Sequence, residues 1–220
     1  MEERRSKMSK EQILGKLRQN VRETYDMPDL SFEKTTYPDP VAEFIRQATT
    51  TAGAKLIEVP KEEVQGSRVQ GVQCSMFNVQ CYIEQAYPDA KVIASNVPGI
   101  KADLNPDTVE RAQDLDGTDV GVVEGGVACA ENACVWIPMN MKQKAICFIS
   151  ESLVIIVRRE NIVSNMHEAY AWLKEKDTSP EGTSKYGFGT FISGPSKTAD
   201  IEQSLVYGAQ AAKSVTILLV

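Results

Sequence analysis

Five consecutive apolar residues, from Leu153 to Val157, restrict the fold of this chain more than any other feature of its sequence. A run without a polar side predicts a strand that is covered on both faces, and strands of that kind belong mainly to parallel sheets. Elsewhere in the chain, short apolar runs alternate with segments of helical periodicity. The sequence therefore predicts an α/β fold around a mostly parallel, doubly wound sheet flanked by helices, with 153–157 as a central strand.

The predicted elements follow from periodicity, capping residues and turn residues. Helices are expected over 9–24, 39–53, 75–87, 105–113, 164–176 and 198–209, and strands over 55–59, 91–94, 120–123, 127–130, 134–137, 153–157 and 215–220. Two of these strands, 127–130 and 134–137, are too close for a crossover helix, so an antiparallel pair should make the sheet mixed. We expect a helical extension and connector over 1–36 and the α/β domain over 37–220.

Charge and hydropathy exclude several classes of protein. The 220 residues carry 24 Lys and Arg against 30 Asp and Glu, a net charge of −6. An acidic chain has no field that would hold a polyanion, so nucleic-acid binding is not expected. No apolar run approaches the roughly 20 residues that cross a bilayer. The first seven residues are charged and lack the apolar region of a secretion signal, so the expected location is cytoplasmic.

Residues typical of metal and redox sites are sparse. The five cysteines include no C-x-x-C pair, and His167 is the single histidine. We predict reduced thiols, no metal and no cofactor, since no G-x-G-x-x-G is present either. The pair Cys129 and Cys134 is interpreted as two small buried residues. His167 is expected on the exposed side of its helix.

A first candidate site lies in the segment 191–202, where a β-like run meets a Gly194-Pro195 break and a predicted helix start. Unpaired N–H groups at a helix start attract anions. The proposed ligand-binding residues of this segment are Gly194, Ser196, Lys197, Thr198 and Asp200. The alternative is that Ser196 or Thr198 only caps a structural helix. The polar loop 178–189 beside it is interpreted as a mobile lid.

A second candidate site lies at the expected carboxyl ends of the strands, where open α/β sheets bind ligands. Glu124 is a tentative nucleophile or general base, and Gly125 and Gly126 permit close approach of a ligand to the backbone. Arg158 follows the central strand and can pair with an anion. Glu124 as a plain turn carboxylate and Arg158 as a solvated side chain remain the alternatives. We expect the two candidate sites to face one hollow that binds a small anionic ligand.

The segment Gly194-Pro195-Ser196-x-Thr198-Ala199-Asp200-Ile201-Glu202, followed by Leu205-Val206-x-Gly208, resembles the C-terminal signature of the lactate utilisation protein C family, the LUD domain. A Tyr-Pro-Asp-Pro segment at 37–40 also resembles the start of that domain. The resemblance implies a fold like that of NagB, RpiA and CoA transferases. It further implies iron–sulfur partner proteins and a role in oxidising L-lactate to pyruvate.

Two positions depart from the family pattern. Ala209 to Ala212 replace a common His-Gly-Pro, and Glu124 to Ala128 replace a Gly-Thr turn. The first functional hypothesis is therefore an accessory, ligand-binding subunit of a lactate-oxidising system. The second is an isomerase or an acyl- or CoA-transferring enzyme, because CoA transferases of the implied superfamily use a glutamate nucleophile, here Glu124. A scaffold without a ligand is the third, and the sequence does not decide whether the chain is an enzyme.

Overall fold

A computed structural model describes residues 9–20, 26, 28, 33–60, 72–177, 188–200 and 202–220. The chain divides into two compact units, 1–33 and 34–220. In the first, helix α1 (Lys10–Asn20) is preceded by Ser9, whose Oγ accepts a hydrogen bond from the Gln12 amide, while the Gln12 side chain accepts one from the Ser9 amide. This reciprocal cap confirms the predicted helix start. The predicted helix end at 24 lies outside the described residues.

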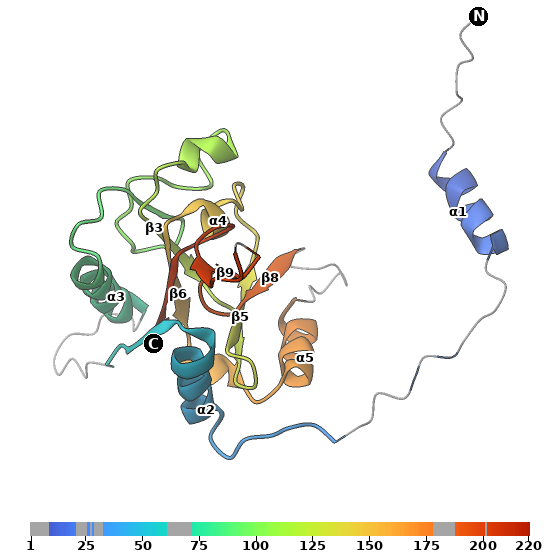
Figure 1. The fold of residues 1–220 in the computed structure, drawn as a ribbon, viewed down its shortest axis with the longest axis horizontal. Coiled ribbons are helices and arrows are strands. Elements are labelled where there is room, and N and C mark those ends of the chain that lie inside the picture. Colours follow the sequence, from blue (N-terminus) through green and yellow to red (C-terminus); the bar gives the residue numbers. More distant parts are fainter. Residues whose placement is uncertain are drawn as a thin grey trace, which may run out of the picture. The chain divides into compact units, whose positions relative to one another are not determined.

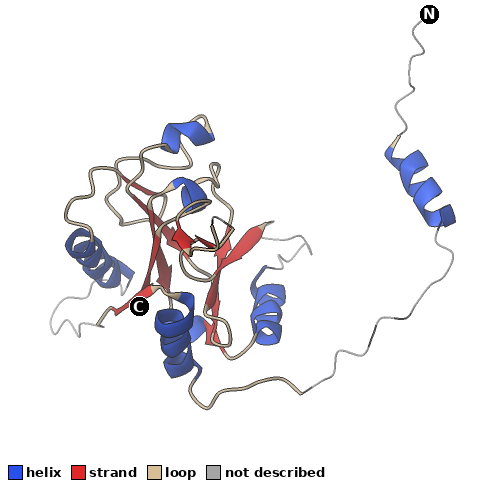
Figure 2. Cartoon of the chain, viewed as in Figure 1, coloured by secondary structure: helices blue, strands red, loops and turns tan. Residues whose placement is uncertain are grey.

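The second unit is built on a five-stranded sheet in which every neighbouring pair of strands is parallel (Figures 1 and 2). The strand order is β1-β11-β6-β3-β2. The bounds are β1 (Lys55–Glu58), β2 (Ile93–Ser95), β3 (Val120–Glu124), β6 (Ser152–Val157) and β11 (Ser214–Leu219). The apolar run 153–157 is thus the central strand, as predicted.

The central sheet is covered on both faces, which explains why its strands are apolar throughout. Leu153, Ile155 and Val157 point into one core, and Val154 and Ile156 point into the other. Helix α3 (Val72–Ala86) covers the second core with Val79 and Ile83. The two cores confirm the α/β class predicted from the sequence.

A second, four-stranded sheet packs on the first core, in the order β7-β4-β5-β8. Its bounds are β4 (Val127–Cys129), β5 (Cys134–Pro138), β7 (Ile162–Val163) and β8 (Gly189–Ile192). Its outer face is covered by α5 (Met166–Asp177), where Trp136 packs near Trp172. Figure 1 shows α3 and α5 on opposite sides of the two sheets. The antiparallel pair β4–β5 therefore belongs to a separate sheet, and not to a mixed central sheet as expected.

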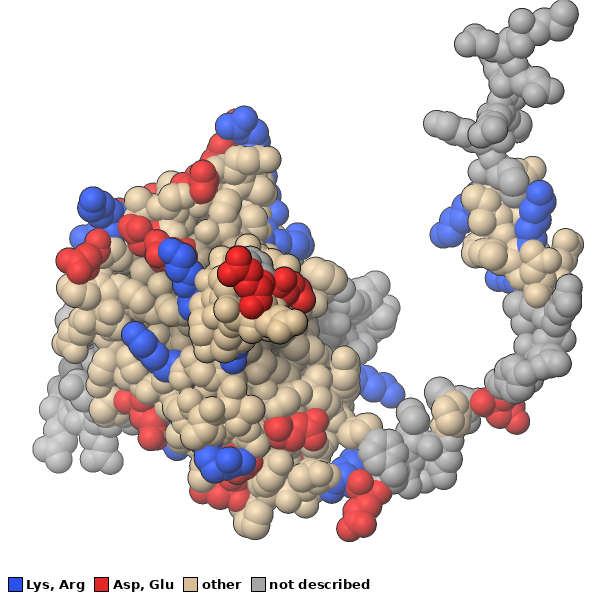
Figure 3. Space-filling view, viewed as in Figure 1, with Lys and Arg blue, Asp and Glu red and all other residues tan. Residues whose placement is uncertain are grey.

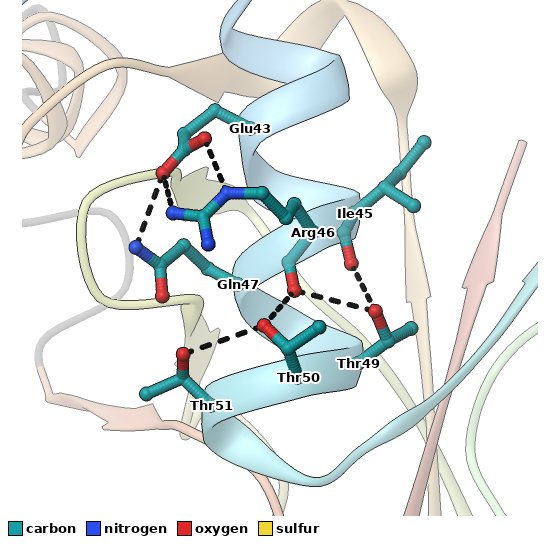
Figure 4. Close-up of polar contacts among 7 residues, drawn as sticks. All are labelled: Glu43, Ile45, Arg46, Gln47, Thr49, Thr50 and Thr51. Atoms are coloured by element: carbon teal, nitrogen blue, oxygen red, sulfur yellow. Dashed lines mark hydrogen bonds and ion pairs between the residues drawn. The ribbon is translucent and has the colours of Figure 1, made fainter.

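Helix α2 (Pro40–Gln47) begins as predicted, with Asp39 accepting a hydrogen bond from the Ala42 amide and Pro40 in the first turn. It continues into a π-helical turn, η1 (Ala48–Ala52), which ends at Gly53 with a φ of 75°. Figure 4 shows how the turn is held: Thr49 and Thr50 donate to main-chain carbonyls one turn back. The remaining helical pieces are short: η2 (Ala112–Leu115), α4 (Ile146–Ile149) and η3 (Arg159–Asn161).

Two predicted helices are wrong. The segment 198–209 contains no helix among its described residues; instead β9 (Lys197–Thr198) and β10 (Val206–Tyr207) form a two-stranded hairpin. Over 105–113, the Asn105 side chain accepts the Asp107 amide and fixes a turn, and only the short η2 follows. The side chains of Asn105, Thr108 and Thr198 bond the local backbone in these segments, which favours turns as readily as helix starts.

Candidate functional site

The carboxyl ends of three neighbouring parallel strands border a cavity of about 360 Å³. Asn96 follows β2, Glu124 ends β3 and Arg158 follows β6. Because parallel strands end at the same edge, residues distant in sequence meet here, at the position where open α/β sheets bind ligands. The structure thus brings Glu124, Gly125, Gly126 and Arg158 to the wall of one cavity.

Glu124 and Arg158 form a loose ion pair at this edge. Arg158 Nε lies 3.8 Å from Glu124 Oε1, and Arg158 Nη1 lies 4.0 Å from Glu160 Oε1. The side chains of Arg158 and Glu124 are 52% and 54% exposed. Pairs this long and this exposed are weak, so a carboxylate ligand can compete for the guanidinium at little cost.

The two glycines do not offer free amides to a ligand. The Gly125 N–H donates to the Ile156 carbonyl and the Gly126 N–H to the Trp136 carbonyl, both at 2.8 Å. A Cβ at Gly125 would lie 2.4 Å from the Val135 side chain, and one at Gly126 would lie 2.9 Å from Trp136. The glycines therefore let the chain pass between the two sheets, and their amides are already bonded within the protein.

Sequence analysis missed part of the cavity wall. The loop after β2 contributes Val97 and Pro98, and the segment after β5 contributes Asn140 and Met141. Asn161 also faces the cavity, and its amide group donates to the Gly126 carbonyl at 2.9 Å. The end of the parallel strand β2 at Ser95 was the available signal for the loop that follows it, because residues that follow parallel strands are candidates for this edge. The strand β5 is antiparallel to both of its neighbours and gave no such signal. The remaining wall residues are Pro138, at the end of β5, and Trp172, from α5.

The other candidate segment, 193–200, lies at the opposite end of the central sheet. The Ser196 amide donates to the carbonyl of Ala212, two residues before β11 begins. A second cavity, of about 370 Å³, is lined there by Gly194, Ser196 and the first core residue of β6, Leu153. No residue of 193–200 lines the first cavity, so the expectation of one shared hollow is wrong. The expected anion cradle is also wrong in form, because no helix starts at 198.

Contacts within the chain account for two residues of this segment. Gly194 has a φ of 66°, and a Cβ there would lie 2.2 Å from the Ala52 carbonyl oxygen. The Lys197 ammonium donates to the same oxygen, at the end of η1. A cation on a terminal helix carbonyl is stabilising. Gly194 and Lys197 thus fasten the hairpin to η1.

The hairpin tip is also internally bonded. Thr198 Oγ1 donates to Asp200 Oδ2 at 2.9 Å and accepts the Asp200 amide at 3.3 Å. Both side chains are therefore occupied in a turn, a structural role for residues predicted to bind a ligand. Their ligand-binding role stays a prediction.

Burial controls the chemistry of the second cavity. Cys147 lines it and is 1% exposed, and burial raises the pKa of this thiol to about 12. A thiol in an apolar wall stays protonated at neutral pH and is a poor nucleophile. Ser193 and Ser196 are the hydroxyl groups available there, and the Ser193 hydroxyl donates to the Asn132 carbonyl at 2.7 Å. Among the described residues that line this cavity, none is an activated nucleophile.

Metal-ligating residues and membrane-spanning helices were searched over the described residues. Among them, no group of three His, Cys, Asp or Glu side chains is placed to hold a metal ion. His167 is exposed on α5, as predicted. None of the described helices is both long and apolar enough to cross a membrane. Figure 3 shows Lys and Arg interspersed with Asp and Glu on the face in view.

The structure is an α/β domain with a cavity at the carboxyl edge of its parallel sheet, the position where open α/β sheets bind ligands. The LUD domain matches residues 42–220, and the chain belongs to that family. A solved structure of a DUF162 family protein from Deinococcus radiodurans has the same fold, with a TM-score of 0.55 and 16% identity over 81% of this chain and 97% of that chain.

Two relatives are each called lactate utilization protein C. The protein from Geobacillus sp. (strain WCH70) is 29% identical over 103 residues, 46% of this chain and 42% of that protein. The protein from Geobacillus thermodenitrificans (strain NG80-2) is 28% identical over 117 residues, 53% of this chain and 45% of that protein. The chain thus matches less than half the length of these relatives.

Proposed function

We propose that the protein acts in L-lactate utilisation together with iron–sulfur partner proteins and binds a small carboxylate in the cavity at the carboxyl edge of β2, β3 and β6. The names of the two Geobacillus relatives support the pathway, and the signature at 194–208 supports the partners by its resemblance to lactate utilisation protein C. In this proposal electrons pass through the partners, and this chain supplies the binding site.

The observation that carries the proposal is the position of Arg158. Its guanidinium follows the central strand and lines the cavity, and among the described residues the ion pairs that hold it are the two long ones to Glu124 and Glu160. A planar guanidinium matches a carboxylate with two parallel hydrogen bonds. Asn161 adds a polar wall and Trp172 an apolar one. The site therefore suits a short acid with a carboxylate and a hydroxyl or keto group.

Thermal unfolding of the full chain with L-lactate, pyruvate, acetate and D-lactate tests the proposal. A true ligand raises the unfolding temperature as RT ln(1 + [L]/Kd) predicts, and acetate separates general salt effects from recognition. Arg158→Met should abolish the response, whereas the matched variant Arg159→Met should keep it, because Arg159 pairs with Glu58 at the end of β1. Equal responses of the two variants would contradict the proposal.

One observation supports a second function, transfer of an acyl or CoA group or isomerisation. Glu124 ends β3 at the cavity wall, half exposed and reachable by a ligand. A carboxylate in that position can attack a thioester or abstract a proton. Incubation with acetyl-CoA followed by intact-protein mass spectrometry would detect an adduct, which Glu124→Gln should remove. Stabilisation by CoA or phosphosugars, without a response to lactate or pyruvate, would favour this second function over the first.

A further inference from the structure

Three sulfur atoms meet where the second sheet contacts α5. Cys129 ends β4 and Cys134 begins β5, and the two residues are direct partners across the antiparallel pair. Directly opposite residues on one face of a sheet have Cβ atoms about 5 Å apart, so the two thiols are neighbours. The Cys134 thiol also donates to the Met166 Sδ at 3.4 Å, at the first residue of α5. Met166 lies 32 residues after Cys134 in the sequence, so the fold alone brings these sulfur atoms together.

The turn between the two cysteines fixes their positions. The Glu131 amide donates to the Ser164 carbonyl at 3.1 Å, and the Asn132 side chain accepts the Cys134 amide at 3.1 Å. Ala133 adopts a φ of 53°, which closes the turn tightly before β5. Ligands that surrounding hydrogen bonds hold in place lose little freedom when they bind a metal ion.

We propose that Cys129, Cys134 and Met166 form a binding site for a soft monovalent metal ion, with Cu(I) as the best match. Two thiolates and one thioether are ligands that select Cu(I) over harder ions. With metal–sulfur bonds of about 2.3 Å, a trigonal site needs sulfur atoms about 4.0 Å apart. The present 3.4 Å between Cys134 and Met166 therefore has to open by about half an ångström, which the flexible Met side chain permits.

Binding balances as an exchange of one metal ion for two thiol protons. The Cys134 thiol now donates to Met166, and the Cys129 thiol donates to the Ser164 carbonyl at 4.0 Å. Cys129 and Cys134 are 0% and 4% exposed, whereas Met166 is partly exposed and offers the approach from solvent.

A disulfide is the competing fate of two opposed cysteines. It requires the removal of two electrons by an added oxidant. It also does not use the third sulfur, that of Met166, which lies 3.4 Å from the Cys134 sulfur. The three sulfur atoms together therefore favour a metal over oxidation.

Anaerobic titration of the reduced full chain with Cu(I), in competition with the chelator bathocuproine disulfonate, tests the site. The variant Cys74→Ser/Cys81→Ser/Cys147→Ala keeps only the proposed pair and should bind one Cu(I) per chain, as the wild type does. Adding Cys129→Ser and Cys134→Ser should abolish binding. Met166→Leu should weaken binding by at least roughly tenfold, the low end of the loss seen for outer-shell partners of metal sites. Unchanged urea midpoints of these variants show that the fold is intact.

X-ray absorption identifies the third ligand independently of affinity. Selenomethionine-labelled chain loaded with Cu(I) should show one copper–selenium distance, and Met166→Leu should remove it. Cu(I) binding that survives the loss of both cysteines overturns the proposal. So does a reduced chain that binds no Cu(I), or one that only forms a disulfide, with a mass loss of two hydrogens, when it is exposed to peroxide.

Discussion

The two edges of the central sheet differ in how their polar groups are used. At the carboxyl edge, Arg158 and Glu124 are half exposed and more than 3.5 Å apart, so both can bind something else. At the amino edge, Lys197 donates to the Ala52 carbonyl and the Ser196 amide donates to that of Ala212. Similar residue types therefore have different roles at the two edges. The carboxyl edge keeps polar groups available, and the amino edge uses them to fasten the hairpin.

This difference shows why a sequence motif is not by itself a site. The signature at 194–208 contains hydroxyls, a lysine and an aspartate, yet the contacts of Lys197, Thr198 and Asp200 are within the chain. A group already satisfied by the protein has to give up that bond before it binds a ligand. Glu124 and Arg158, at the ends of β3 and β6, have only long, exposed ion pairs to give up.

Among the predictions that test the comparison of the two sheet edges, the largest change in stability is expected at Gly194. Gly194→Ala combines a positive φ with a Cβ that meets backbone at Ala52, which cannot move aside, and should lower the free energy of unfolding by about 3 kcal/mol. Gly117→Ala is the matched control, because its φ is 78° but nothing lies within 4 Å of the new Cβ. It should cost about 1 kcal/mol in urea denaturation. Equal losses would show that the close approach to η1 does not matter.

A crossed pair of variants tests the comparison directly. Lys197→Met removes a charged donor from the Ala52 carbonyl and should cost about 1.5 kcal/mol of stability without changing the response to lactate or pyruvate. Arg158→Met removes only loose ion pairs and should cost less than about 0.5 kcal/mol while abolishing that response. Urea denaturation and ligand-dependent thermal shifts measure the two quantities on the same samples. If Lys197→Met lost the thermal response to lactate or pyruvate, the segment 194–200 would belong to the ligand site.

A smaller effect is expected in the pH dependence of folding stability, through a carboxyl group at the amino edge of the sheet. The amides of Val92 and Lys91 donate to Asp119 Oδ2 and lower the pKa of this carboxyl, just before β3. A lowered pKa in the folded state stabilises the fold above the unfolded pKa near 4, and the gain is lost as the pH falls through the folded pKa. Asp119→Asn should therefore cost about 1 kcal/mol at pH 7. In urea titrations at several pH values, the difference in unfolding free energy between Asp119→Asn and the wild type should narrow below pH 4. A gap that stays constant would assign the loss to packing.

The smallest effect concerns only the chemical reactivity of a buried cysteine thiol. Because burial raises the pKa of Cys147 to about 12, this thiol should resist iodoacetamide at pH 8 in the native chain and react after unfolding. Cys81 is partly exposed and serves as the internal comparison. Peptide mass spectrometry resolves the two sites. Rapid native labelling of Cys147 would show that the second cavity opens to solvent.

Sequence reasoning succeeded where local pattern and tertiary environment agree. The apolar run 153–157 is the central strand, Asp39 and Pro40 begin α2, and the β3 strand ends at Glu124. It failed where local hydrogen bonds allow two structures. Thr198 and Asp200 fit a helix start and a turn equally well, and the pairing of β9 with β10 decided between them. Long-range pairing overrides local preference when both states satisfy the backbone.

The amino-acid sequence alone determined the α/β class, because a strand without a polar face must be covered on both sides, and it also determined the family through the signature at 194–208. Tertiary structure alone decided that this signature and Glu124 lie at opposite edges of the sheet, and that Met166 joins Cys129 and Cys134. The physical reason is that spacing along the chain records which groups can bond locally, whereas strand order determines which distant groups meet.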